Sequence, residues 1–338
     1  RLAPKTPLLG RCNPRVEVRE VEPGYPAIFA AVNPTFSEPP PEARSSHRRK
    51  VLAEWIASAD NMLTARVLVN RLWQHLFGRG IVRSPNNFGL GGTPPTHPLL
   101  LDYLAAEFVE GNWQMKPLIR QIVLSDTYRS SSRPSEKAVA RDPLNHLFSH
   151  QNMRRLSAEE VRDSILQVTD QLNLQQQGPS IYPEISKEVL HSQSMPGKGW
   201  GHSPPDQAAR RSIYIHIKRT LVAPILKIFD FAETDLSCPV RFETTQPTQA
   251  LPMLNGKFAQ DQAAALAERV EHAYPGDQAA QVKEILELVW QRPIQKQEID
   301  AGLSLINQLQ QQDGASIRRA LETFSLVAIN SNEFIYLD

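Results

Sequence analysis

Apolar residues recur every three to four positions along most of the chain, and this spacing predicts helices. The clearest example covers residues 61–77. It begins at Asn61, a residue type that often caps a helix start, and it ends before Gly78, which tolerates a left-handed backbone. Its body is apolar on nearly every side, so we expect it to be buried. Further helices are predicted at 47–59, 96–110, 116–128, 156–172, 221–231, 258–273, 277–290, 295–311 and 316–330.

Polar residues interrupt the apolar helix at 61–77. Arg66 and Asn70 share one stripe of the helix, and Arg71 and His75 share another. A buried guanidinium group without a partner costs about 3–5 kcal/mol. We therefore expect carboxylate or carbonyl partners for these arginines, supplied by the second half of the chain.

One segment alternates between apolar and polar residues. Residues 211–218 (RSIYIHIK) place three isoleucines on one side and Tyr214, His216 and Lys218 on the other. Strict alternation is typical of a half-buried strand. We expect this strand to pair with residues 16–21 or with part of the loop at 175–209.

The predicted fold is mainly α and multi-helical, with two packed helical lobes and a small β element around 211–218. A proline-rich extended arm covers 1–44, where nine prolines restrict the backbone. The first lobe covers 45–150 and the second 151–338. A long loop at 175–209, rich in Gly, Pro, Ser and Gln, belongs to the second lobe, and a loop of that length is often functional or disordered.

Composition narrows the range of functions. The chain has 338 residues, of which 41% are hydrophobic and 22% charged, which is ordinary for a globular protein. It has no apolar run of about 18 residues, so no membrane span is predicted. The net charge of +1 argues against nucleic acid as a partner. Basic residues gather in 44–83 and acidic ones in 255–338, which fits either a dipolar docking protein or two solvated faces.

The two cysteines, Cys12 and Cys238, stand in no CxxC, CxxCH or zinc spacing, so we expect neither haem nor metal to be attached to this chain. They could pair in an exported protein, or be buried thiols in a cytosolic one. The sequence starts at Arg1 without a signal peptide and looks like a processed product or an excised part.

Candidate catalytic groups are few. His146 and His150 have the i, i+4 spacing of metal ligands, but no third donor is near them in sequence. Glu159, Glu160 and Asp163 could offer a carboxylate pair, with Arg162 and Asp163 expected on the helix surface. Glu160, however, is also explained as one half of a capping box that begins at Ser157.

Arginines with neighbouring aromatic and polar residues form a larger candidate group. A guanidinium suits bidentate recognition of carboxylate, sulfate or phosphate, so a converging set could bind an anion or an acidic sugar. The alternative is that they pair internally with Asp102, Glu107, Asp163, Asp230 and Glu243. The binding candidates are Arg66, Asn70, Arg71, His75, Arg129, Arg154, Arg155, Trp200, His202, Arg210, Arg211 and Tyr214.

Several motifs occur together in a fixed order. They are RRKVLAEWIASADNMLTARVLVNRLWQHLFGRGIVRSPNNFG, PTHPLLLDYLAAEF, IVLSDTYRSSS, RRLSAEEVRDSIL, GPSIYP, RRSIYIHIKR, FDFAETDLSCPVRFETTQPTQALPMLN and the terminal NSNEFIYLD. From about Val16 to Asp338 the chain resembles the planctomycete-specific C-terminal domain. That domain follows a c-type cytochrome domain in large exported proteins of Planctomycetes. The resemblance implies export to the periplasm or outside the cell and work beside a haem domain, and it supplies no catalytic residue.

We therefore expect a non-catalytic binding or docking domain that serves electron-transfer or polysaccharide-related complexes. Its partners would be a c-type cytochrome domain or protein, or an anionic polysaccharide, and haem would sit on a partner or an upstream domain. The alternative is an enzyme that acts on a polysaccharide, such as a sulfated one, with carboxylate and His residues near the loop at 175–209. A pocket lined by such residues beside that loop would favour the enzyme.

Overall fold

The computed structural model describes residues 6–10, 13–26, 42, 45–241, 243–244 and 247–338. The chain divides into two compact units, Arg1–Gln151 and Asn152–Asp338. The described part is mainly α, as predicted, with two small two-stranded sheets. In that part, none of the helices has the length and hydrophobicity of a membrane span.

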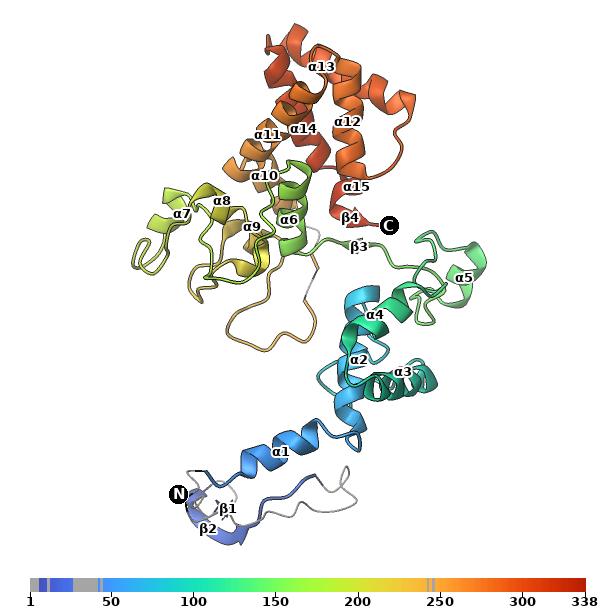
Figure 1. Cartoon of the computed structure of the whole chain (residues 1–338), viewed down its shortest axis with the longest axis vertical. Coiled ribbons are helices and arrows are strands. Elements are labelled where there is room, and N and C mark those ends of the chain that lie inside the picture. Colours follow the sequence, from blue (N-terminus) through green and yellow to red (C-terminus); the bar gives the residue numbers. More distant parts are fainter. Residues whose placement is uncertain (1–5, 11–12, 27–41, 43–44, 242, 245–246) are drawn as a thin grey trace. The chain divides into compact units, whose positions relative to one another are not determined.

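The first unit contains a hairpin and helices (Figure 1). Strands β1 and β2 pair antiparallel, so the segment predicted at 16–21 is a strand, but its partner is β1. Much of the remaining arm, 27–41 and 43–44, lies outside the described residues. The elements are β1 (Thr6–Gly10), β2 (Asn13–Val21), α1 (Arg48–Ile56), α2 (Met62–Phe77), α3 (Pro98–Glu110), α4 (Met115–Val123) and α5 (Glu136–Arg141).

Helix α2 forms the centre of the first unit's core. Val69, Trp73 and Phe77 are almost inaccessible, and they pack with α3, α4 and Phe148. Gly78 ends the helix at a left-handed φ of 74°, as predicted, whereas the Asn61 side chain makes no capping hydrogen bond. The helix predicted at 47–59 is formed as α1, but none of its residues is buried.

The second unit is built around a helical bundle. Its elements are β3 (Arg154–Arg155), α6 (Ala158–Val168), α7 (Lys187–His191), α8 (Pro205–Ala208), a 3-10 helix η1 (Ser212–Tyr214), α9 (Pro224–Ile228), α10 (Pro247–Asn255), α11 (Lys257–Ala273), α12 (Gln278–Trp290), α13 (Lys296–Gln312), α14 (Ile317–Ile329), α15 (Asn332–Ile335) and β4 (Tyr336–Leu337).

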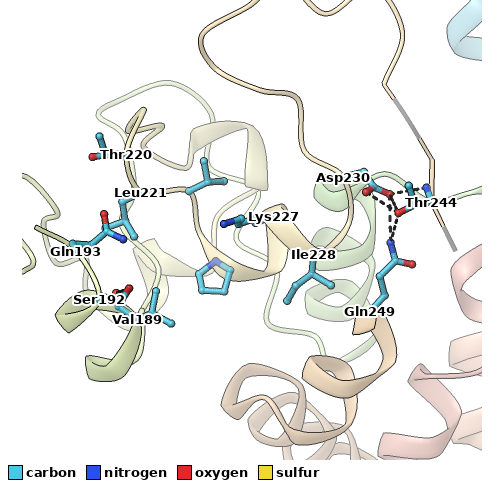
Figure 2. A pocket seen from close by; sticks show the side chains of 12 residues that line it. Val189, Ser192, Gln193, Thr220, Leu221, Lys227, Ile228, Asp230, Thr244 and Gln249 are labelled. Atoms are coloured by element: carbon cyan, nitrogen blue, oxygen red, sulfur yellow. Dashed lines mark hydrogen bonds between the residues drawn. The ribbon is translucent and has the colours of Figure 1, made fainter. Parts of the chain in front are cut away.

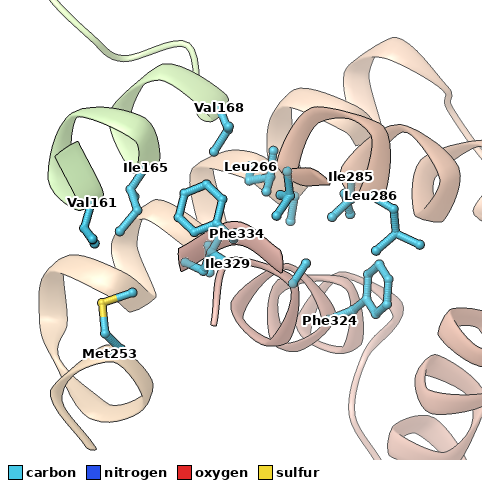
Figure 3. Close-up of a cluster of buried hydrophobic side chains, with 14 of the residues drawn as sticks. Val161, Ile165, Val168, Met253, Leu266, Ile285, Leu286, Phe324, Ile329 and Phe334 are labelled. Atoms are coloured by element: carbon cyan, nitrogen blue, oxygen red, sulfur yellow. The ribbon is translucent and has the colours of Figure 1, made fainter. Parts of the chain in front are cut away.

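The core of this bundle joins segments that are distant in sequence (Figure 3). Ile165 of α6, Leu266 of α11, Ile285 of α12 and Ile329 of α14 are all fully buried and belong to one cluster. Strands β3 and β4 pair antiparallel, so the C-terminal residues are attached beside the start of α6. Helix α14 buries Leu321 and Phe324, whereas its Val327 is 47% exposed.

The strand predicted at 211–218 is not formed. Ser212–Tyr214 makes a turn of 3-10 helix, and Ile215 makes only an isolated bridge to Ile181 of the preceding loop. The isoleucines do not share a face, because Ile215 is buried while Ile213 is 74% exposed. The physical reason is a tertiary contact. The Asp163 carboxylate accepts the Ser212 backbone N–H at 2.7 Å, which turns the chain away from an extended path.

Candidate functional site: two adjoining pockets of the second unit

The candidate residues of the first unit are held by neighbours within that unit. Arg66 forms an ion pair with Asp102 of α3, and Arg71 donates to Asn86 Oδ1 at 2.9 Å. Asn70 is fully buried, and its amide bonds both the N–H and the C=O of Val82. The expectation of partners from the second half of the chain was therefore wrong for these two arginines. Beyond them, His75 and Arg129 are exposed.

Three candidate arginines of the second unit form ion pairs within that unit. Arg154 bonds both oxygens of Glu160, while Arg155 reaches Asp230 Oδ2 at 2.9 Å. Arg211 contacts Asp163 Oδ2 at 3.2 Å. These pairs match the internal alternative, in which the arginines stabilise the fold.

Arg210 has a different set of partners. It is 1% exposed and donates to the backbone carbonyls of Gln175, Gln177 and Pro179 in the long loop. Its guanidinium lies 3.9 Å from the centre of the Tyr214 ring, a cation–π contact. Arg210 and Tyr214 therefore attach the first part of the long loop to the body of the unit.

Trp200 and His202 lie in the later part of that loop. Trp200 donates its indole N–H to the Pro183 carbonyl at 3.2 Å and packs against the rings of Tyr182 and His216. His202 is exposed. The aromatic residues here fix the loop rather than line a pocket.

The prediction that Arg162 and Asp163 lie on the helix surface was wrong. Arg162 is only 3% exposed, and its guanidinium donates to the carbonyls of Ala208 and Arg210 and to the Ser212 hydroxyl. Burial lowers the pKa of Arg162 to about 10, although the nearby Asp163 carboxylate opposes that shift. The clue in the sequence was that Arg162 shares a helix face with the apolar residue Leu166, four positions later.

Two pockets adjoin helix α9, and Val189, Pro224 and Ile228 line both of them. The polar pocket, about 510 Å³, is shown in Figure 2. Its apolar wall comes from α9 and the segment before it. Its polar lining residues are Ser192, Gln193, Thr220, Lys227, Asp230, Thr244 and Gln249.

Asp230 stands at one end of the polar pocket and is held in place by several donors. Thr244 gives its backbone N–H at 2.8 Å and its hydroxyl at 2.9 Å, and Gln249 adds its amide at 3.4 Å (Figure 2). Burial alone would raise the pKa of this carboxyl. The hydrogen bonds from Thr244 and Arg155 outweigh that effect and lower the pKa. Asp230 is therefore an ionised, fully engaged carboxylate at neutral pH.

Lys227, Thr244 and Gln249 were not singled out from the sequence. These residues are related only by their position around α9 in the folded structure. No sequence motif or regular spacing indicates that position. The Lys227 side chain has no hydrogen bond or ion pair within the described part of the chain.

The cysteine and histidine candidates Cys238, His146 and His150 do not line either pocket. Cys238 is an exposed free thiol, so it is not the buried thiol expected for a cytosolic protein, and Cys12 lies outside the described residues. His146 contacts Arg83, and the His150 carbonyl accepts from Asn145. The described residues include no group of three His, Cys, Asp or Glu side chains that could hold a metal ion.

Comparison with known proteins places the chain in a family. Residues 48–306 match a family model described as PSD1, a protein of unknown function (DUF1553). The chain belongs to the DUF1553 family. No significant match was found among curated proteins or among solved structures. The DUF1553 match includes every residue that lines the two pockets, since these residues all fall between Arg162 and Gln262.

Proposed function

We propose that this DUF1553 domain is a non-catalytic binding domain of an exported, cytochrome-associated protein of the planctomycete type. We propose further that its polar pocket binds an anionic saccharide. Export and the cytochrome partner rest on the sequence resemblance. The saccharide rests on the lining of the pocket around α9.

The observation that carries this proposal is the charge of Lys227. Among the described residues that line the polar pocket, the charged side chains are Lys227 and Asp230. Asp230 is already balanced by Arg155 at 2.9 Å, whereas Lys227 has no such neighbour in the described structure. The pocket therefore carries one unbalanced positive charge, which favours a ligand with a sulfate or carboxylate group.

The uncharged lining suits the rest of a saccharide. Ser192, Gln193 and Thr220 offer hydroxyl and amide groups, which can both donate to and accept from sugar hydroxyls. Leu221 and Pro224 provide an aliphatic wall against which the C–H face of a sugar ring can pack. A volume of about 510 Å³ falls within the usual range of small-ligand sites.

The state of Asp230 supports binding over catalysis. A general acid or base works best with a pKa near the operating pH. The pKa of Asp230 is instead lowered by its hydrogen bonds, and its oxygens are occupied by Arg155, Thr244 and Gln249. His, expected for the enzyme alternative, does not line this pocket in the described part of the chain.

The test is calorimetric titration of the chain with a sulfated oligosaccharide and with its desulfated counterpart. We expect the sulfated form to bind at least tenfold more tightly, because a charged hydrogen bond contributes about 1.5–3 kcal/mol. Lys227→Met should remove that preference. Lys296→Met, an exposed lysine at the start of α13, is the matched control and should leave binding unchanged.

Equal affinity for the two oligosaccharides, or full binding by Lys227→Met, would refute the saccharide site. Analysis of the oligosaccharide after long incubation decides between binding and catalysis, since shortened or desulfated products would show an enzyme. A visible absorption spectrum of material purified from its native source tests the cytochrome partner. A haem Soret band accompanying the chain is the expected result.

A further inference from the structure

A second cavity lies against α9 and differs in character from the polar pocket. It has a volume of about 420 Å³ and is lined mainly by apolar side chains. α9 supplies Ile225 and Ile228, the residue after α9 is Phe229, and α10 and α11 supply Met253 and Phe258. A concave apolar site with a few polar groups is the usual form of a small-molecule site.

Arg162 is the buried charged residue in the wall of this cavity. Its guanidinium lies 5.8 Å from the centre of the Phe258 ring, which lines the same cavity. A guanidinium has five N–H bonds. In the described structure, Nη1 donates to Arg210 and Ser212, and Nη2 donates once, to Ala208.

The five N–H bonds thus have three acceptors in the described structure, so Nε and Nη2 can still donate to an incoming group. These two nitrogens form one edge of the guanidinium fork, and a carboxylate binds such an edge through two parallel hydrogen bonds.

The charge of Arg162 is also weakly compensated. The nearest carboxylate is Asp163, at 3.8 Å, and it is shared with Arg211 and with the Ser212 backbone N–H. The other acceptors of Arg162 are neutral. Burial lowers its pKa, in keeping with a guanidinium whose charge lacks a close partner.

The remaining charged residues of the cavity form a separate, exposed group. Lys257 contacts Glu184 at 3.2 Å and Asp261 at 2.8 Å, and all three side chains are more than half exposed. These carboxylates are therefore engaged by Lys257 in water, and the buried wall keeps a single cationic group.

We propose that this cavity is a binding site for a small apolar carboxylate, with the acid group on the free edge of Arg162 and the hydrocarbon between α9, α10 and α11. The ligand class is an alkanoate or arylalkanoate. This site is independent of the saccharide proposed for the polar pocket, although both use α9.

The test compares octanoate with 1-octanol on the full chain by ligand-observed NMR and thermal shift. Octanoate should bind saturably and raise the melting temperature, and 1-octanol should bind at least tenfold more weakly. This comparison needs no substitution at Arg162, whose removal could unfold the protein.

A cavity-filling variant locates the site. Ala209 lines this cavity but not the polar pocket, and its side chain is only partly buried. Ala209→Phe should abolish octanoate binding while leaving saccharide binding unchanged. Ala140→Phe, at an exposed position of α5 in the other unit, is the control and should bind octanoate normally.

Three results would overturn the proposal. They are no saturable octanoate binding at millimolar concentration, equal binding of 1-octanol, or full octanoate binding by Ala209→Phe. Loss of saccharide binding with octanoate binding intact would contradict only the function proposed for the polar pocket.

Discussion

Arg210 shows how a single arginine can order a loop that has little regular structure. Three backbone carbonyls between Gln175 and Pro179 accept from its guanidinium, and Tyr214 covers its face. Lysine carries the same charge, but its three donors sit on one nitrogen, so it cannot reach three carbonyls that Arg210 bonds with three different nitrogens. This difference gives a test of the residue's role.

We predict that Arg210→Lys lowers the free energy of unfolding by about 3 kcal/mol, because the buried charge at position 210 loses hydrogen bonds to the loop carbonyls. Arg211→Lys is the adjacent control. Arg211 is 58% exposed in its side chain, so its ion pair with Asp163 should contribute less than about 1 kcal/mol. Urea unfolding followed by circular dichroism measures both. If both variants lose the same free energy of unfolding, Arg210 does not stabilise the fold more than its exposed neighbour does.

Asp230 gives a prediction that depends on pH. Its pKa is lowered in the folded state, so its stabilising effect is present above the unfolded pKa of about 3.9 and is lost as pH falls through the lower folded value. At pH 7, Asp230→Asn should be less stable than the parent chain by about 2 kcal/mol. That difference should shrink below about pH 4, where the parent carboxyl also becomes protonated.

Urea unfolding of both proteins at several pH values measures this difference. A difference that stays constant down to the lowest pH at which the chain folds would mean that the charge of Asp230 does not matter. In that case its contribution would come from shape and neutral hydrogen bonding alone.

Sequence patterns identified several residue roles but not the pockets. The internal pairing of Arg66 with Asp102, and of Arg155 with Asp230, was one of the two alternatives that the sequence left open. Lys227 was missed because pocket residues from α9 and from distant loops share no periodicity. Arg162 was misplaced because a charged side chain is normally exposed, and only tertiary carbonyl acceptors make its burial tolerable.

Among the elements, helix starts were predicted best. Ser157 and Glu160 form the expected capping box, and the Asp277 side chain accepts from Ala280 at the start of α12. Capping signals depend on neighbours in sequence, although the Asn61 side chain makes no such bond at the start of α2. The segment 211–218 failed for the opposite reason, since its alternation was overruled by the hydrogen bond from Ser212 to Asp163.

A glycine controls the packing of helices α12, α13 and α14. A Cβ at Gly302 of α13 would lie 2.6 Å from Val282 Cγ1 and 2.9 Å from Phe324 Cε2. Alanine normally favours a helix over glycine by about 1 kcal/mol. Here we predict that Gly302→Ala lowers stability by about 1–3 kcal/mol, because the three helices would be overpacked.

The double variant Gly302→Ala with Val282→Ala provides the control. Removing the Val282 methyl groups makes space for the new Cβ, so the two losses should not add. Thermal or urea unfolding of the two single variants and the double variant completes the cycle. Additive losses would show that the predicted contact with Val282 is not what destabilises Gly302→Ala.

At the scale of the whole molecule, the buried apolar residues form two clusters. One is made only from residues 65–148 and the other only from residues 156–334. This agrees with the division of the chain into two units at Gln151. Each unit therefore has a hydrophobic core of its own, which is what independent folding requires.

We predict that a fragment covering 152–338 folds by itself and unfolds cooperatively, and that it retains the octanoate and saccharide binding proposed for the full chain. Circular dichroism, thermal unfolding and the same titrations measure this. A fragment that is soluble yet lacks a cooperative transition would show that the second unit depends on the first.

The separation between the bundle and the pockets also has a consequence for the order of folding. Consecutive helices from α11 to α14 contact one another, in addition to the long-range contact of α11 with α14. The pocket walls depend instead on contacts such as Arg162 with Ala208, 46 residues away. Local contacts form sooner because they close shorter loops. We therefore expect the bundle to fold first and the walls of the two pockets to form last. A bound ligand should slow local unfolding of the pocket walls more than it slows unfolding of the bundle.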